Sequence, residues 1–91
     1  MIRFINVEHF GCLMQATHQL NVLGYLCPIP VAEAKKALRE LTTGHVLEII
    51  ADDPETQHDL PLLIDRTGHE LIETREEAGE FFFLVKVLQD D

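Results

Sequence analysis

Apolar and polar positions change their period several times along the chain. Residues 20–23 and 45–51 are short apolar runs with the length and the branched side chains of buried strands. Between them, apolar residues recur every three or four positions, at Val31, Ala34, Leu38 and Leu41. The charged residues of this segment fall at the positions between them. This spacing predicts an amphipathic helix from Pro30 to about Leu41, which Gly44 follows as a stop signal.

The segment after the second strand combines helix-starting and helix-breaking signals. Asp53 can cap a helix that carries Pro54 at its first position. Pro61 has no amide hydrogen and its ring clashes with the preceding turn. We therefore expect a turn near residues 54–59, a helix over about 60–67, and Gly68 in the left-handed conformation at its end.

The last third of the chain is typical of strands. His69–Arg75 and Phe81–Leu88 flank residues 76–80, whose length and glycine suit a hairpin loop. The predicted order is β-α-β-α-β-β. A chain of 91 residues has material for two layers, so we expect an α/β (α+β) sandwich in which two helices cover one face of a four-stranded mixed sheet. Residues 18–91 would form this single domain, and residues 1–17 an amino-terminal extension.

The last predicted strand is apolar on both of its faces. Phe82, Leu84 and Leu88 alternate there with a second apolar set, made up of Phe81, Phe83, Val85 and Val87. Something should therefore cover the face that the helices leave open. One candidate is the amino-terminal segment with Ile2, Phe4, Ile5, Val7 and Phe10. The other is a partner protein, or a second copy in a homo-oligomer.

Charge and composition narrow the partners. The net charge of −9 repels phosphate backbones, so direct binding of RNA or DNA is not expected. No apolar run reaches the 18 or so residues of a membrane span, and the amino-terminal stretch does not read as a signal peptide. We expect a cytoplasmic protein that needs no membrane, in which Cys12 and Cys27 are free thiols.

Cys27 stands at a position that suits thiol chemistry. It falls between the first predicted strand, which ends at Gly24, and the first helix, so its sulfur would precede a helix amino terminus, where a thiolate is stabilised. Pro28 and Pro30 restrict the backbone around it and would hold the sulfur in one orientation. The same pattern is compatible with Cys27 as a small buried residue that only starts the helix.

Other thiol and metal chemistries find less support. Position 29, where a dithiol site would carry its second cysteine, is isoleucine, and local spacing places no histidine beside Cys27. His9 and Cys12 are too few ligands for zinc, so no metal or organic cofactor is expected. Cys12 could act as a resolving thiol, although an incidental role suits its unpatterned surroundings.

The predicted first helix carries a small basic cluster. Three of the seven basic residues of this acidic chain lie on it, namely Lys35, Lys36 and Arg39. The cluster is either a solvated helix face or a docking surface for an acidic partner.

Several of these elements together resemble the TusA/SirA family of small sulfur carriers. They are the run from Gly24 to Pro30 with its Cys-Pro-Ile-Pro sequence, the Lys35-Lys36 pair, Asp52-Asp53-Pro54, Asp59-Leu60-Pro61 and Gly68-His69. The likeness runs from His18 to about Leu88. It departs from the family pattern at Asn21, where many members carry Asp, and in the residues before about Met14.

The resemblance implies a sulfurtransferase-type carrier that works as a relay. Cys27 would accept sulfane sulfur as a persulfide from a cysteine desulfurase or a rhodanese, and pass it to an acceptor protein. Acceptors in the family serve tRNA thiolation, molybdenum-cofactor enzymes or sulfur oxidation, and the residues do not select among them. Two other hypotheses stay open at this point: a non-catalytic interaction module, and a redox sensor in which Cys27 forms a disulfide.

Overall fold

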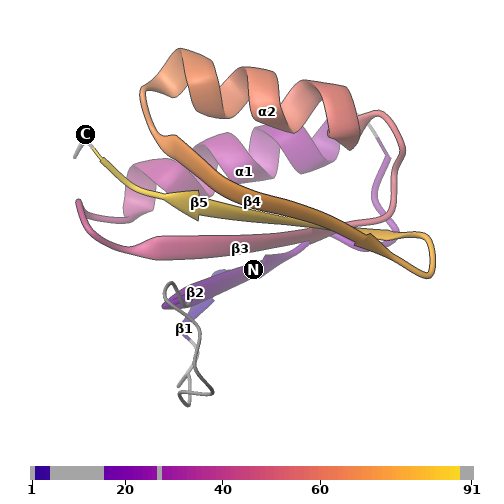
Figure 1. Cartoon of the computed structure of the whole chain (residues 1–91), viewed down its shortest axis with the longest axis horizontal. Helices are drawn as coiled ribbons and strands as arrows, with labels where there is room; N and C mark the ends of the chain where they lie inside the picture. Colours follow the sequence, from indigo (N-terminus) through magenta and orange to yellow (C-terminus); the bar gives the residue numbers. More distant parts are fainter. Residues whose placement is uncertain (1, 5–15, 27, 89–91) are drawn as a thin grey trace.

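The computed structural model describes residues 2–4, 16–26 and 28–88. In these residues the elements follow one another as β1 (Ile2–Phe4), β2 (His18–Asn21), α1 (Ile29–Glu40), β3 (Val46–Ala51), α2 (Thr56–Thr67), β4 (Glu70–Glu77) and β5 (Glu80–Lys86). Both helices lie on one side of the sheet (Figure 1). The predicted α/β sandwich and the order β-α-β-α-β-β from residue 18 onward are confirmed.

The sheet is mixed, and its topology places three loops at one end. Its strand order over the described residues is β1-β2-β3-β5-β4. β2 and β3 are parallel, whereas β5 runs antiparallel to both of its neighbours, β3 and β4. The loop after β2, the loop after β3 and the hairpin between β4 and β5 therefore all lie at the carboxyl ends of β2 and β3.

The strand β1 adds to the four strands that the sequence predicts. Ile2–Phe4 pairs antiparallel with β2, with Arg3 opposite Gln19. It therefore lies at the sheet edge, beside β2. Predictions for Ile5, Val7 and Phe10 fall outside the described residues, and the division at residue 17 stays a prediction.

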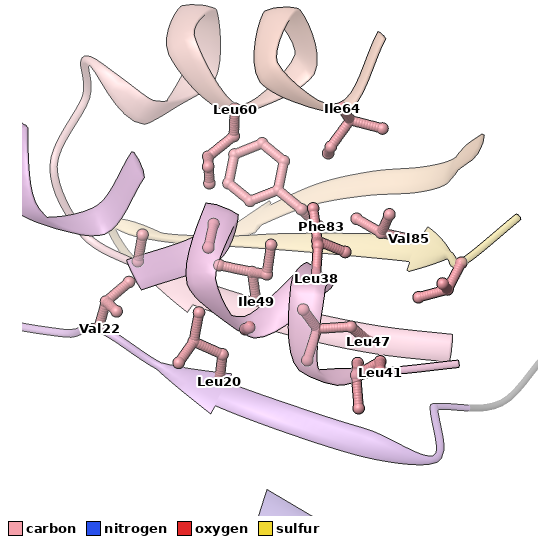
Figure 2. Close-up of a cluster of buried hydrophobic side chains, with 14 of the residues drawn as sticks. Leu20, Val22, Leu38, Leu41, Leu47, Ile49, Leu60, Ile64, Phe83 and Val85 are labelled. Atoms are coloured by element: carbon pink, nitrogen blue, oxygen red, sulfur yellow. The ribbon is translucent and has the colours of Figure 1, made fainter. Parts of the chain in front are cut away.

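A single apolar core fills the space between the helices and the sheet (Figure 2). Leu20, Ile49 and Phe83 come from three neighbouring strands and are almost fully buried beneath the helices. Leu38 reaches this cluster from α1, and Leu60 from α2. Because the alternate residues of each strand share a face, these positions explain the periodicity seen in the sequence.

The helix α2 is longer than its sequence predicts. It begins at Thr56 and continues through Pro61 without a break, so the predicted turn is limited to residues 54–55 and the prediction is wrong for residues 56–59. A proline at this place removes one intrahelical hydrogen bond, to the carbonyl of Gln57. That loss is offset by the burial of one side chain per turn on the core face, at Thr56, Leu60 and Ile64. Gly68 ends the helix with φ +81°, as predicted.

Asp53 lies one turn ahead of the helix that it was predicted to cap. Its carboxylate accepts the Glu55 amide at 3.2 Å, and its carbonyl oxygen accepts the Thr56 hydroxyl at 2.6 Å. Asp53 is itself buried. It therefore organises the turn from which α2 starts, but it is not the residue that directly precedes the helix.

The hairpin loop is shorter than predicted. The strands extend to Glu77 and from Glu80, which leaves only Ala78 and Gly79 as the turn. Both have positive φ, at 51° and 83°. Two central residues with positive φ match the right-handed twist of the flanking strands, so a two-residue connection forms in place of the expected five-residue loop.

The two apolar faces of β5 meet different surroundings. Phe81, Phe83, Val85 and Val87 are buried on the helix side, whereas Phe82 and Leu84 are half-buried on the open side. The Arg75 guanidinium lies 4.4 Å from the centre of the Phe82 ring and covers part of it. A second copy or partner on this open face stays a prediction.

Candidate functional site

The loop that carries the cysteine motif leaves β2 through a tight turn. The Val22 amide donates to the Ile50 carbonyl at 2.8 Å and so extends the pairing of β2 with β3 by one step. The Tyr25 amide then donates back to the Val22 carbonyl at 3.2 Å. Gly24 has φ +85°, at the third position of this four-residue turn. That position is strained for residues with a β-carbon, which explains the glycine.

A second contact ties this turn to the loop after β3. The Gly24 amide donates to Oδ1 of Asp52 at 3.0 Å, and Oδ1 of Asn21 accepts the Leu23 amide at 2.9 Å. The sequence had not pointed to a role for Asp52. Its signal is visible only after the fold is known, because Gly24 and Asp52 are brought together by the parallel pairing of β2 and β3.

The helix α1 starts immediately after Cys27. Pro28 is its N-cap residue and Pro30 lies buried in its first turn. The Ile29 amide donates to the Leu26 carbonyl at 3.0 Å, so the residues on either side of Cys27-Pro28 are joined by a hydrogen bond. Cys27 and Cys12 themselves lie outside the described residues, and their predicted states as free thiols stay predictions.

The amino terminus of α1 is electrostatically open. None of its described first-turn residues is acidic, and no side chain caps it. In the first turn Pro30 has no amide hydrogen and the Ile29 amide is already bonded to Leu26, so it is mainly the helix dipole that favours a negative charge placed there, by about 0.3 to 1 kcal/mol. The surroundings of this end therefore suit an anionic sulfur.

The predicted basic residues lie farther along α1. Lys35, Lys36 and Arg39 are exposed, as a solvated face or a docking surface requires. At 1.5 Å per residue they stand about 9 to 15 Å along the axis from the helix start. They are part of the surface that surrounds the motif, but they do not form its immediate environment.

Exposed apolar side chains adjoin the motif, and sequence reasoning missed them. Tyr25 is 42 % exposed, Leu26 71 % and Ile29 46 %. A groove of about 210 Å³ starts at Pro28 and runs between the two helices to Leu62, which is 50 % exposed. The pattern of apolar residues had predicted which positions face the core, but not which remain uncovered.

The histidines that the structure describes include a pair away from the motif. The rings of His18 and His45 have centroids 4.8 Å apart, at the amino-terminal ends of β2 and β3. The motif loop follows the opposite ends of these strands. Burial, with a smaller contribution from His45, lowers the pKa of His18 below its ordinary value. This pair does not serve as a base beside the motif.

The described part of the chain contains no cluster of three or more histidine, cysteine, aspartate or glutamate side chains that could hold a metal ion. The predicted absence of a metal site at His9 and Cys12 concerns residues outside that part. Among the described helices, none is long and apolar enough to span a membrane.

Comparison with known proteins identifies the family. The family model for sulfurtransferase TusA matches residues 18–87. The chain belongs to the TusA family. The match starts where β2 starts and ends just after β5, so it contains both helices, the cysteine motif and the Asp-Asp-Pro loop. The predicted membership of the TusA/SirA family is confirmed.

Individual relatives agree with this assignment. The sulfur carrier protein TusA of Allochromatium vinosum is 43 % identical over 68 residues, covering 75 % of this chain and 90 % of that protein. A putative sulfur carrier protein of Archaeoglobus fulgidus is 40 % identical over 73 residues, covering 79 % and 95 %. The crystal structure of a SirA-like protein from Desulfitobacterium hafniense superposes with a TM-score of 0.69 at 29 % identity, covering 78 % of this chain and 97 % of that one.

Proposed function

We propose that this TusA-family chain is a sulfur carrier that holds the sulfur as a persulfide on Cys27. The observation that carries the proposal is the place of Cys27 in the family fold. It follows the turn held by Gly24 and directly precedes Pro28, the N-cap of a helix with an open amino terminus. The function predicted from the sequence agrees with the family to which the chain belongs.

Electrostatics supports a reactive sulfur at this position. A thiolate, not a thiol, is the nucleophile in sulfur exchange, and thiols near helix amino termini have lowered pKa values as a class. The first turn of α1 contributes no competing carboxylate among its described residues. The helix therefore favours the anionic form of the sulfur both before and after it is loaded.

The transfer conserves atoms and electrons without a cofactor. The Cys27 thiolate attacks the outer sulfur of a donor persulfide, a new sulfur–sulfur bond forms, and the bond to the donor cysteine breaks. The donor cysteine leaves as a thiolate. In the second step an acceptor nucleophile attacks the outer sulfur on Cys27, and Cys27 leaves as a thiolate in turn.

The donor would be a cysteine desulfurase or a rhodanese, and the acceptor a protein of a sulfur-using pathway in the cytoplasm. Because the sulfurs must touch, specificity would come from the surface around Cys27. The exposed residues Lys35, Lys36 and Arg39 are suited to docking an acidic partner. Changing all three to glutamate should slow transfer while leaving the unfolding transition in place. An unchanged transfer rate would remove the docking role.

Intact mass measures the central step directly. The wild-type protein and the variants Cys27→Ser and Cys12→Ser are incubated with a cysteine desulfurase and cysteine, and then weighed with and without reductant. We expect wild type and Cys12→Ser to gain one sulfur atom that reductant removes, and Cys27→Ser to gain none. A gain that persists in Cys27→Ser would assign the sulfur to another residue. The absence of any gain with several donors would favour the non-catalytic interaction module.

A further inference from the structure

The groove that starts at Pro28 has a defined chemical character. It is formed by apolar side chains of both helices with one charged residue of each sign at the rim, and its lining consists of Pro28, Val31, Asp59, Leu62, Leu63 and Arg66. The floor is therefore apolar and the rim polar. This composition resembles the centre of a protein interface more than a site for a small polar molecule.

Uncovered apolar side chains gather around this groove. Five large apolar residues are exposed in the described part of the chain, and four of them are next to the motif or on the groove wall: Tyr25, Leu26, Ile29 and Leu62. The fifth, Leu88, follows β5 near the carboxyl end of the chain. Apolar surface of this kind gains free energy when a partner covers it.

The charge at the groove rim indicates what kind of partner fits. Arg66 is exposed, and no hydrogen bond or ion pair reaches its side chain from any described residue. An uncompensated cation at the rim of an apolar groove, in a chain of net charge −9, favours a partner that presents a carboxylate there.

We propose that the groove between α1 and α2 receives an apolar side chain of the sulfur-donor protein, next to a carboxylate of that protein that pairs with Arg66. This inference rests on the proposed carrier function and specifies how the donor is held. Pro28 belongs both to the groove and to the cysteine motif, so a side chain seated in the groove brings the donor surface alongside Cys27. Positioning of the reacting atoms in this way accelerates transfer without any change in the chemistry of the sulfur.

The chain offers a matched pair of variants for the test. Leu62→Gln makes the groove wall polar while keeping a good helix-forming residue. Leu88→Gln makes the same chemical change at a residue of similar exposure, 44 % against 50 %, that does not line the groove. Arg66→Gln removes the rim charge. All three proteins are first compared with wild type in urea unfolding, so that a folding defect is recognised.

Loading is then measured with two sulfur sources. A cysteine desulfurase with cysteine requires docking, whereas inorganic polysulfide reaches Cys27 without it. We expect Leu62→Gln to raise KM for desulfurase-driven loading by about three- to tenfold, which corresponds to loss of part of one buried apolar contact. Arg66→Gln should weaken the salt dependence of loading, Leu88→Gln should match wild type, and polysulfide should load all four proteins equally.

The outcomes separate the two proposals. If the desulfurase loads Leu62→Gln as well as wild type, or if both leucine variants slow loading equally, the groove is not the docking site although the carrier function stands. If the defect of Leu62→Gln appears only in discharge to an acceptor, the donor is not the occupant. If neither source loads Cys27 in wild type, the carrier function fails, and the docking proposal fails with it.

Discussion

The contact between Gly24 and Asp52 allows a test of how firmly the fold holds the cysteine loop. The Asp52 carboxylate accepts the Gly24 amide at 3.0 Å, three residues before Cys27. Removing the carboxylate in Asp52→Ala leaves β2 and β3 intact, since their pairing ends at Asn21 and Ile50. The turn is then held by the 3.2 Å bond from the Tyr25 amide to Val22 and by the 2.9 Å bond from the Leu23 amide to Asn21. We expect the loop to become less ordered while the rest of the domain keeps its structure.

The size of the effect follows from the geometry. A hydrogen bond to a charged acceptor contributes about 1.5 to 3 kcal/mol when it is well shielded. The Gly24–Asp52 bond is exposed, so water competes for both groups and about 1 kcal/mol is the appropriate magnitude. One kcal/mol changes an equilibrium about fivefold. If transfer proceeds from the ordered loop, the transfer rate of Asp52→Ala should be up to about fivefold lower than that of wild type. The reduction is largest when the disordered loop is the major form in the variant.

Amide hydrogen exchange reports on the loop directly. In Asp52→Ala the Gly24 amide should exchange about fivefold faster than in wild type, while amides inside β3 keep their protection. Asp52→Asn retains an acceptor oxygen, so its Gly24 amide should exchange at a rate between those of wild type and Asp52→Ala. Asp65→Ala is the charge control, because Asp65 is an exposed carboxylate on α2 with no hydrogen bond to the loop in the described structure. Equal Gly24 protection in wild type and Asp52→Ala would refute the reasoning.

Three further perturbations test other parts of the fold. In the hairpin, Ala78→Gly should stabilise the protein by about 1 kcal/mol because φ is +51° there, whereas Gly79→Ala at φ +83° should destabilise it by a similar amount. If urea unfolding showed both variants shifting the free energy of unfolding in the same direction, this reasoning would be contradicted. Pro61→Ala restores an amide inside α2 and should raise the free energy of unfolding in urea by about 1 to 2 kcal/mol, the net of the better helix and the greater freedom of the unfolded chain; an unchanged value would count against this. The pKa of His18 is lower in the folded protein than in the unfolded chain, so the unfolded chain takes up the His18 proton at a higher pH. The free energy of unfolding should therefore fall as pH drops below about 6.5, and His18→Gln should make this pH dependence less steep.

The sequence predicted the elements whose side chains share one buried face. Leu38 recurs with its neighbours at helical spacing because α1 lies along the sheet, and the apolar run that contains Ile49 reflects a strand at the centre of the sheet. In both places local preference and burial agree. The family resemblance then supplied what spacing could not, namely that Cys27 belongs to a sulfur carrier.

The errors lie where the local signal of one residue is absent or is outweighed by tertiary packing. Pro61 disfavours a helix locally, yet the burial of Leu60 and Ile64 on the same helix outweighs the single hydrogen bond that proline removes. Ala78 gave no signal for a tight turn, because alanine seldom takes positive φ and only its neighbour Gly79 favours it. Tertiary context decided both cases, and a local pattern contains no information about it.

The parallel pairing of β2 and β3 explains why the two motif segments together are more informative than either alone. The Cys-Pro-Ile-Pro and Asp-Asp-Pro segments are more than twenty residues apart, and each alone is a weak signal. Asn21 pairs with Ile50 at the carboxyl ends of β2 and β3, so the loops that follow these strands leave the sheet side by side. Asp52, in the loop after β3, then accepts the Gly24 amide and so holds the turn in the loop after β2. This cross-loop contact fixes the backbone three residues before Cys27, and it is therefore the contact whose loss we expect to reduce sulfur transfer first.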